Sequence, residues 1–324
     1  MKQNIEFTVK PELLGAIGNL WDGELSELSP FKYGKTSSIT NEHKTELKKI
    51  GICDNNGKIT DKVKPAIEVL ANARAFTRIY IHNGLNIFEY ISYFNADGNA
   101  ASVTNDSGDQ LINYPAPNNG ILENIRQNIG ETIYRNSDFE CDIKSSEALV
   151  LAAMMDIQRK TFMSDIVDEK ETGAISMDIG RIQSMLSGNA KNYQWLTYII
   201  RDMMEGKAFN SSEKIEPVLD SLVKIGYVTR HNGGYRLTQD TLLLSRRMLL
   251  LDTFLTLTSG RIGRDGKVVI VGFTGIQSGV HDLLFIDANK DSILIDAVSS
   301  AVMLDYVSHF LEPSGALEGK NKSC

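Results

Sequence analysis

The sequence predicts an α+β protein made of two quasi-two-fold related repeats, with an antiparallel sheet flanked by helical bundles. The first observation is an internal match between residues 47–52 and residues 222–227. Each copy ends a helical pattern and leads, through a polar turn with glycine, to a short strand that ends at Thr60 or at Thr238. The second observation is that both halves then continue into runs of β-branched and aromatic residues and close with an amphipathic helix. A duplicated architecture explains these matches better than two unrelated domains do.

The first repeat is expected at residues 1–143. Thr40 is a suitable N-cap for the helix that opens its winged-helix-like segment, and Asn83-Gly84 is typical of a tight turn between two strands. Apolar residues from Leu122 to Ile129 recur at helical spacing. We therefore expect three parts in this repeat: a winged-helix-like segment at 40–73, strands at 77–115 and a closing helix at 120–130.

The second repeat is expected at residues 144–312. Ser212 is its candidate N-cap, Asp265-Gly266 its candidate turn between strands, and the apolar spacing from Leu304 to Leu311 its closing helix. The expected parts are a helical segment at 146–206, a winged-helix-like segment at 212–251, strands at 254–296, a closing helix at 299–311 and a disordered tail at 313–324.

The winged-helix-like pattern raises one alternative function, DNA binding by a transcriptional regulator with tandem winged helices. A DNA reader needs several Lys or Arg contacts to phosphate. The helix of the second copy has a negative local balance, with Glu213, Glu216 and Asp220 against Lys214 and Lys224. Only the turn after it favours DNA, so a module for packing or protein contacts is the preferred interpretation.

Composition limits the class of partner and the compartment. Lys and Arg number 34 against 41 Asp and Glu, which gives a net charge of −7 and a pI near 5.4. This balance argues against general attraction to nucleic acid or to anionic membranes. Three cysteines, no apolar leader at the amino end and charges inside the most apolar stretch (residues 241–258) favour a cytoplasmic protein without a membrane span.

No motif in the sequence indicates catalysis. There is no CxxC pair, no His-x-x-x-His pair, no phosphate-binding glycine loop and no nucleophile elbow. Residues 287–291 open like a calcium loop, but Ser292 and Val298 stand where glycine and glutamate are required. We therefore expect no catalytic residues, no metal, no cofactor and no small-molecule substrate. An enzyme whose site is assembled by folding, in a crevice between the lobes, is the remaining hypothesis.

The order of elements resembles the EspG family, cytosolic chaperones of mycobacterial type VII secretion. The similarity includes the opening, with residues 7–9 as a first strand, residues 13–17 as a helix and then Trp21, and the ending, in which residues 283–286 precede a strand and the helix 301–311. The resemblance implies two quasi-two-fold repeats around an antiparallel sheet. It also implies binding, without catalysis, of a helical secretion substrate of the PE–PPE type. The turn at residues 95–99 is shorter than the long loop that the family uses for its partner.

A helical protein partner would be held by helix-in-groove or sheet-edge recognition. The residues that we expect to contact it lie in turns and in the second half: Asp97, Asn99, Arg230, His231, Arg261 and Arg264.

Overall fold

The computed structural model describes residues 4–33, 39–84, 86–188, 191–204, 215–279 and 281–318. Over these ranges the chain forms one ten-stranded antiparallel sheet, a two-stranded ribbon and twelve helices. The predicted α+β class with an antiparallel sheet is therefore confirmed. None of the helices in these ranges is both long and apolar enough to cross a bilayer.

The first half of the chain contains, in order, β1 (Ile5–Val9), α1 (Pro11–Leu20), α2 (Pro30–Tyr33), α3 (Asn41–Lys49), α4 (Lys64–Ala71), β2 (Ala75–Asn83), β3 (Asn86–Phe94), β4 (Ala100–Asp106), β5 (Asp109–Tyr114) and α5 (Asn118–Ile129). The second half contains β6 (Glu140–Lys144), α6 (Ser145–Val167), α7 (Ile179–Ser187), α8 (Leu196–Met203), α9 (Ile215–Lys224), β7 (Val228–His231), β8 (Gly234–Leu237), α10 (Gln239–Arg247), β9 (Thr253–Ile262), β10 (Val268–Ser278), β11 (Asp282–Ala288), β12 (Ser292–Val298), α11 (Ser300–Leu311) and α12 (Pro313–Glu318).

The strands of the large sheet follow the order β1-β5-β4-β3-β2-β9-β10-β11-β12-β6. Consecutive strands pair as hairpins in the runs from β2 to β5 and from β10 to β12. The two edge strands come from earlier in the chain, because β1 pairs with β5 and β6 pairs with β12. Strand β6 exposes Glu140, Asp142 and Lys144 and buries Cys141 and Ile143, so its apolar side chains account for its place on the sheet.

The chain divides into two compact units, each with its own core. The first unit comprises Met1–Asn128, Leu255–Gly272 and Leu304–Cys324, and the second comprises Ile129–Phe254 and Phe273–Met303. The segments of the two units are interleaved along the chain.

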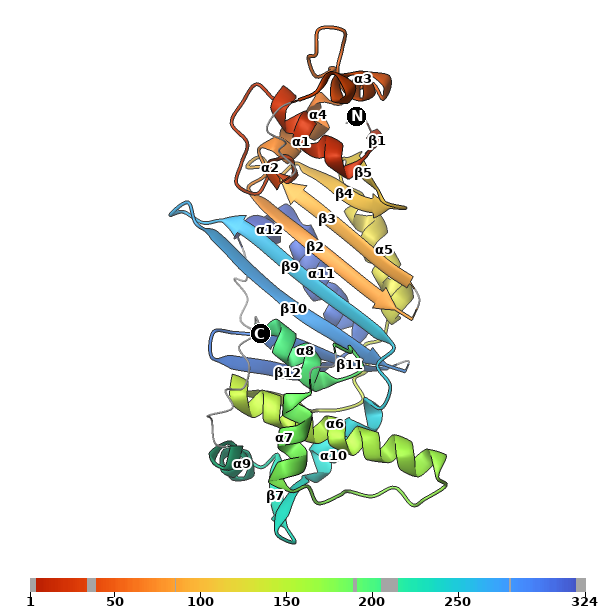
Figure 1. The fold of residues 1–324 in the computed structure, drawn as a ribbon, viewed down its shortest axis with the longest axis vertical. Coiled ribbons are helices and arrows are strands. Elements are labelled where there is room, and N and C mark those ends of the chain that lie inside the picture. The colour runs from red at the N-terminus through yellow and green to blue at the C-terminus, as the bar shows by residue number, and fades with distance from the viewer. Residues whose placement is uncertain are drawn as a thin grey trace. The chain divides into compact units, whose positions relative to one another are not determined.

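In the first unit, helices α1 to α4 pack with strands β1, β5, β4 and β3 around one core (Figure 1). Helix α3 begins at the predicted cap. The Thr40 hydroxyl accepts a hydrogen bond from the His43 amide at 3.2 Å, and His43 Nδ1 accepts one from the Thr40 amide at 3.5 Å. Leu47 from this helix is fully buried in the core.

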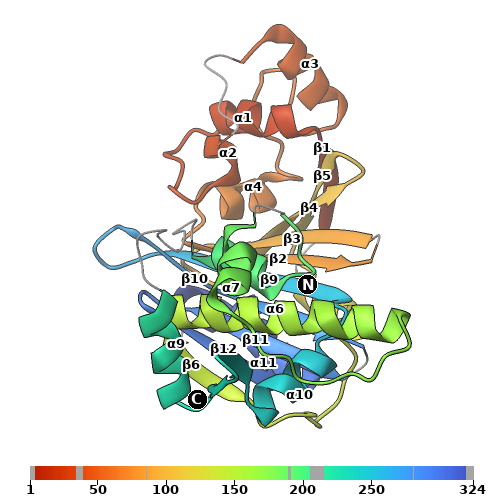
Figure 2. The same cartoon turned by 60° about the horizontal axis from the view of Figure 1, so that its bottom comes forward.

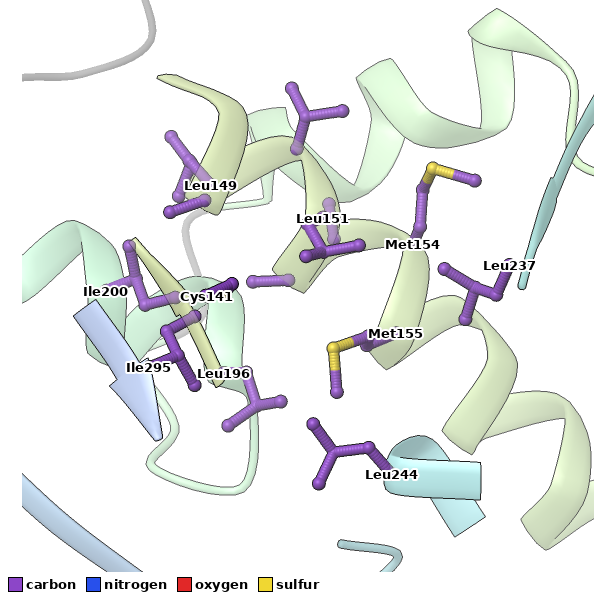
Figure 3. Close-up of a cluster of buried hydrophobic side chains, with 14 of the residues drawn as sticks. Cys141, Leu149, Leu151, Met154, Met155, Leu196, Ile200, Leu237, Leu244 and Ile295 are labelled. Carbon is purple, nitrogen blue, oxygen red and sulfur yellow. The ribbon is translucent and has the colours of Figure 1, made fainter. Parts of the chain in front are cut away.

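In the second unit, α6 is the centre of the helical bundle and contacts α7, α8, α9 and α10 (Figures 1 and 2). Every residue from Glu147 to Arg159 in this helix is buried. Such a helix has no solvent face over this stretch and must be packed on all sides. Figure 3 shows the resulting cluster, in which Leu151 and Met155 of α6 lie among side chains from α8, α10 and the sheet.

The expectation of a disordered tail is wrong for its first part, because residues 313–318 form helix α12. Ala316 is buried against Ala75 and Phe94, and this contact fixes a segment whose Pro, Ser and Gly content is typical of a loop. Residues 319–324 and the predicted N-cap Ser212, with Glu213 and Lys214, lie outside the described residues.

Candidate functional site

The β9–β10 hairpin carries three consecutive exposed apolar residues near its tip. Its tip turns at the predicted Asp265-Gly266, where Gly263 and Lys267 are joined by a 2.7 Å backbone hydrogen bond. Gly266 has a φ of 79°, which an L side chain rarely adopts, so glycine suits this turn. The tip lies at the left margin of Figure 1.

The outer part of β10 combines exposed apolar side chains with an edge that has no β11 partner among the residues that the structure describes. Its register with β11 runs from Thr274 to Ser278 and leaves residues 268–272 without a β11 partner in that register. Within this segment Val268, Val269 and Ile270 are 42, 38 and 64% exposed. We call these three residues the hairpin patch. Contiguous exposed apolar residues beside a free strand edge are typical of an interaction site.

Four of the six predicted contact residues lie at the same end of the first unit's sheet as this tip. The Ile262 amide donates to the Arg74 carbonyl at 2.9 Å, and the Arg74 amide donates to the Phe94 carbonyl at 2.7 Å. The end of β9, the start of β2 and the end of β3 are thus neighbours there. The four residues belong either to the turn between β3 and β4 or to the hairpin: Asp97, Asn99, Arg261 and Arg264.

The turn between β3 and β4 is held by a buried side chain. Asn95 Oδ1 accepts hydrogen bonds from the amides of Asp97 at 3.1 Å and Asn99 at 2.9 Å. This leaves the Asp97 side chain exposed. On the hairpin, Arg264 is exposed and Arg261 is half-buried, with its Nη1 in contact with no hydrogen-bond acceptor of the described residues.

The other two predicted residues lie in β7 of the second unit. Arg230 is exposed but forms an ion pair with Asp220 of α9, and its guanidinium lies 5.5 Å from the centre of the Tyr235 ring. The His231 carbonyl accepts a 2.8 Å hydrogen bond from the Ser176 hydroxyl. The Arg230 charge is therefore compensated within the unit.

The second unit contains a buried ion pair that was not predicted from the sequence. Asp156 and Arg159 of α6 are fully buried, and Arg159 Nη1 donates to Asp156 Oδ1 at 2.6 Å. The Asp156 carboxylate also accepts from the amides of Leu196 and Thr197 and from the Thr197 hydroxyl, at 3.1, 2.8 and 2.7 Å. A side chain of α6 thus caps the first turn of α8, which has no cap of its own. Opposite charges three residues apart inside an apolar stretch were the available signal in the sequence.

Burial dominates the ionisation of this pair. Desolvation raises the pKa of Asp156, while Arg159 and the hydrogen bonds from Thr197 act in the opposite direction. Desolvation also lowers the pKa of the Arg159 guanidinium, against the attraction of Asp156. The pair is enclosed, and of its polar atoms only Arg159 Nε lacks an acceptor among the described residues, so its geometry fits a structural role in joining α6 to α8.

The described ranges contain no group of three or more His, Cys, Asp or Glu side chains that could hold a metal ion. Burial raises the pKa of the Cys141 thiol to about 12, so at neutral pH this cysteine is not a thiolate nucleophile. No protein-family model matches the sequence, and no curated protein matches it either.

Proposed function

We propose that the protein is a non-catalytic cytoplasmic binding protein, an EspG-like chaperone for a helical protein partner. The proposal includes two quasi-two-fold repeats, each with a winged-helix-like module, as the family resemblance implies. The observation that carries it is that the two copies of the internal sequence match have the same local hydrogen bonds.

In the first copy, the Ile52 amide donates to the Leu47 carbonyl at 2.9 Å and the Thr60 amide donates to the Ile52 carbonyl at 2.9 Å. Gly51 ends the helix with a φ of 78°. The second copy repeats each feature: Tyr227 to Leu222 at 3.1 Å, Thr238 to Tyr227 at 3.1 Å, and Gly226 with a φ of 90°. In both copies a helix then follows the threonine, α4 or α10. The spacing is equal from Leu47 to Ile52 and from Leu222 to Tyr227, and the second copy is three residues longer in the turn before its threonine. The same bonding around an insertion confined to a turn supports a common module.

The order of the strands supports the same architecture. Going outward from the central neighbours β2 and β9, the first half contributes β3, β4, β5 and β1, and the second contributes β10, β11, β12 and β6. Each set is a chain of four consecutive strands completed by the strand that opens its half. A closing helix follows each set, α5 or α11. Two copies of one topology account for this order more simply than two independent designs.

The hairpin patch is the surface that we assign to the partner. An amphipathic helix presents an apolar stripe, which Val268 and Ile270 can cover because alternate strand residues share a face, and acidic residues beside that stripe would meet Arg261 and Arg264. A few residues usually carry most of the binding free energy of an interface, so single substitutions in the hairpin patch can test its role.

The test begins with the full chain at native abundance in its own host. Chemical crosslinking and mass spectrometry would identify a partner, which is then purified and titrated calorimetrically. We expect a helical partner whose Kd rises at least tenfold with Ile270→Lys. The matched control is Ile87→Lys, because Ile87 is 66% exposed and lies at the start of β3, at the opposite end of that strand from Phe94.

Equal affinity for both variants would remove the hairpin patch from the interface. If no purified candidate partner binds the wild-type chain, the proposed chaperone function is overturned.

Two further observations fit the proposal. Cys53 and Cys141 are free and buried, as is usual in a reducing compartment, and the Arg230 guanidinium is paired with Asp220 rather than free to bind a phosphate. Duplex DNA binding that weakens steeply with salt would instead favour the winged-helix regulator.

A further inference from the structure

A cavity of about 450 Å³ lies among α6, α7 and α8 of the second unit. This volume is in the usual range for small-molecule sites. Its apolar wall is formed by Ile157, Met185 and Trp195. Its polar lining consists of Lys160, Arg181, Ser184, Thr197, Tyr198 and Arg201, with Gly188 at one side.

Three positive charges converge on this cavity without a negative partner. Among the described residues, no carboxylate forms an ion pair with Lys160, Arg181 or Arg201. The lining residues include no Asp or Glu. The protein as a whole carries a net charge of −7. A local excess of positive charge in an acidic protein attracts an anion.

Both guanidinium groups are held in place by neutral acceptors. Arg201 donates from Nη1 to the Gly188 carbonyl at 2.8 Å and from Nη2 to the Leu186 carbonyl. Arg181 donates from Nη2 to the Thr161 hydroxyl at 3.1 Å. A guanidinium has five N–H donors, so each retains donors for a ligand after these bonds are made. Groups ordered in this way lose little conformational freedom on binding.

The buried ion pair orders the remaining wall. Asp156 caps α8 directly after Trp195, and the Arg159 guanidinium lies 5.7 Å from the centre of the Trp195 ring. Lys160 Nζ lies 5.4 Å from the same ring centre. The indole therefore has a fixed position beside a cation that lines the cavity.

We propose that this cavity binds a small molecule carrying two or more phosphate charges on an apolar or aromatic frame. Two forked guanidinium groups and an ammonium match the oxygen geometry and charge of a phosphate pair. The indole, Ile157 and Met185 provide the contact for the frame. The three cations come from three helices around one cavity of this volume, which favours a compact ligand over an extended acidic peptide.

The chain offers an internal reporter for this binding. It contains two tryptophans, Trp21 and Trp195, so Trp21→Phe leaves a single indole at the cavity. In this background, inorganic pyrophosphate is titrated at constant ionic strength, with sodium chloride as the reference. We expect a saturable change in Trp195 fluorescence with a sub-millimolar Kd, and a rise in the melting temperature with pyrophosphate. ATP should bind more tightly than pyrophosphate if the frame contributes.

Variants separate a site from general charge attraction. Lys160→Gln and Arg181→Gln each remove an exposed cation and should raise the pyrophosphate Kd at least tenfold, whereas Lys160→Arg should keep it within threefold. Lys224→Gln removes one positive charge from α9 outside the cavity and should leave the Kd unchanged. An unsaturable response, or equal weakening by Lys224→Gln, would overturn the proposal. So would tighter binding of a Glu-rich decapeptide than of pyrophosphate, which would mark the cavity as a protein-docking site.

Discussion

Replacing Asp156 by leucine should be among the most destabilising single changes in the second unit. The substitution leaves the Arg159 charge fully buried without its carboxylate, and breaking a buried ion pair in this way costs about 4 kcal/mol. It also removes the acceptor for the Leu196 and Thr197 amides at the start of α8, and loss of a helix cap costs about 1 kcal/mol. We therefore expect a loss of about 5 kcal/mol in the free energy of unfolding.

The double variant Asp156→Leu with Arg159→Met tests the origin of this loss. It removes both charges, so only the cap and the bond from Arg159 to the Leu249 carbonyl are missing. We expect it to be more stable than Asp156→Leu alone by about 3 kcal/mol, because a buried pair can be replaced by apolar residues at little cost.

Arg159→Met alone should cost less than Asp156→Leu, because the carboxylate keeps three donors and can take up a proton. Removing Arg159 removes an interaction that lowers the pKa of Asp156, so the folded pKa moves further above the unfolded value. In the variant, the proton on Asp156 stabilises the folded state at low pH, and this stabilisation is lost as the pH rises through the folded pKa of Asp156. The cost of Arg159→Met should therefore be larger at pH 8 than at pH 5.

Urea unfolding followed by Trp195 fluorescence in the Trp21→Phe background reports on this part of the chain. A cost below about 1 kcal/mol for Asp156→Leu would show that the charge of Arg159 finds solvent or another partner. A double variant as unstable as Asp156→Leu would show that the loss comes from the cap and packing rather than from the uncompensated charge. Either result refutes the assignment of the pair as an energetically coupled unit.

Three further predictions concern other parts of the structure. Asp296 lies opposite Glu140 on the edge pair β12–β6, and burial together with that like charge raises its pKa, so Asp296→Asn should stabilise the fold by about 0.5 kcal/mol at pH 7 in urea melts. Because the folded pKa exceeds the unfolded one, the gain should vanish below about pH 4, and a constant gain would contradict the reasoning. Gly315→Ala should detach α12 from the first unit, because a Cβ at this position would lie 1.8 Å from the His309 carbonyl oxygen. Faster amide hydrogen exchange over residues 313–318 would confirm this, and unchanged exchange would contradict the close contact. Cys141, buried and with a pKa of about 12, should resist iodoacetamide at pH 8 in the native protein, as followed by peptide mass spectrometry, and rapid alkylation would mean that β6 opens.

Local patterns were sufficient for the elements whose causes are local. The Thr40 cap, the Asp265-Gly266 turn and the strands on either side of Asn83-Gly84 follow from capping and turn chemistry within a few residues. The apolar spacing from Leu122 to Ile129 likewise marked α5. In each case the deciding interaction is made by side chains adjacent in the sequence.

Elements that depend on residues distant in the sequence could not be predicted from local sequence patterns. Strand β6 is five residues long with three charged positions, and it is a strand because Cys141 and Ile143 are buried opposite Ile295 and Ile293 of β12. Helix α12 depends on the burial of Ala316 by residues more than 200 positions earlier. The same holds for the cavity in the second unit, whose cations come from three helices and share no sequence motif.

The pairing of the central strands has a consequence for synthesis of the chain on the ribosome. Strand β2 is complete at Asn83, but its neighbour β9 begins at Thr253. About 170 residues must be translated in between, which takes roughly 10 to 30 s at ordinary elongation rates. During that interval the nascent first unit lacks the strand that borders β2. A chaperone that binds nascent chains would therefore be needed most while the residues between β2 and β9 are being translated.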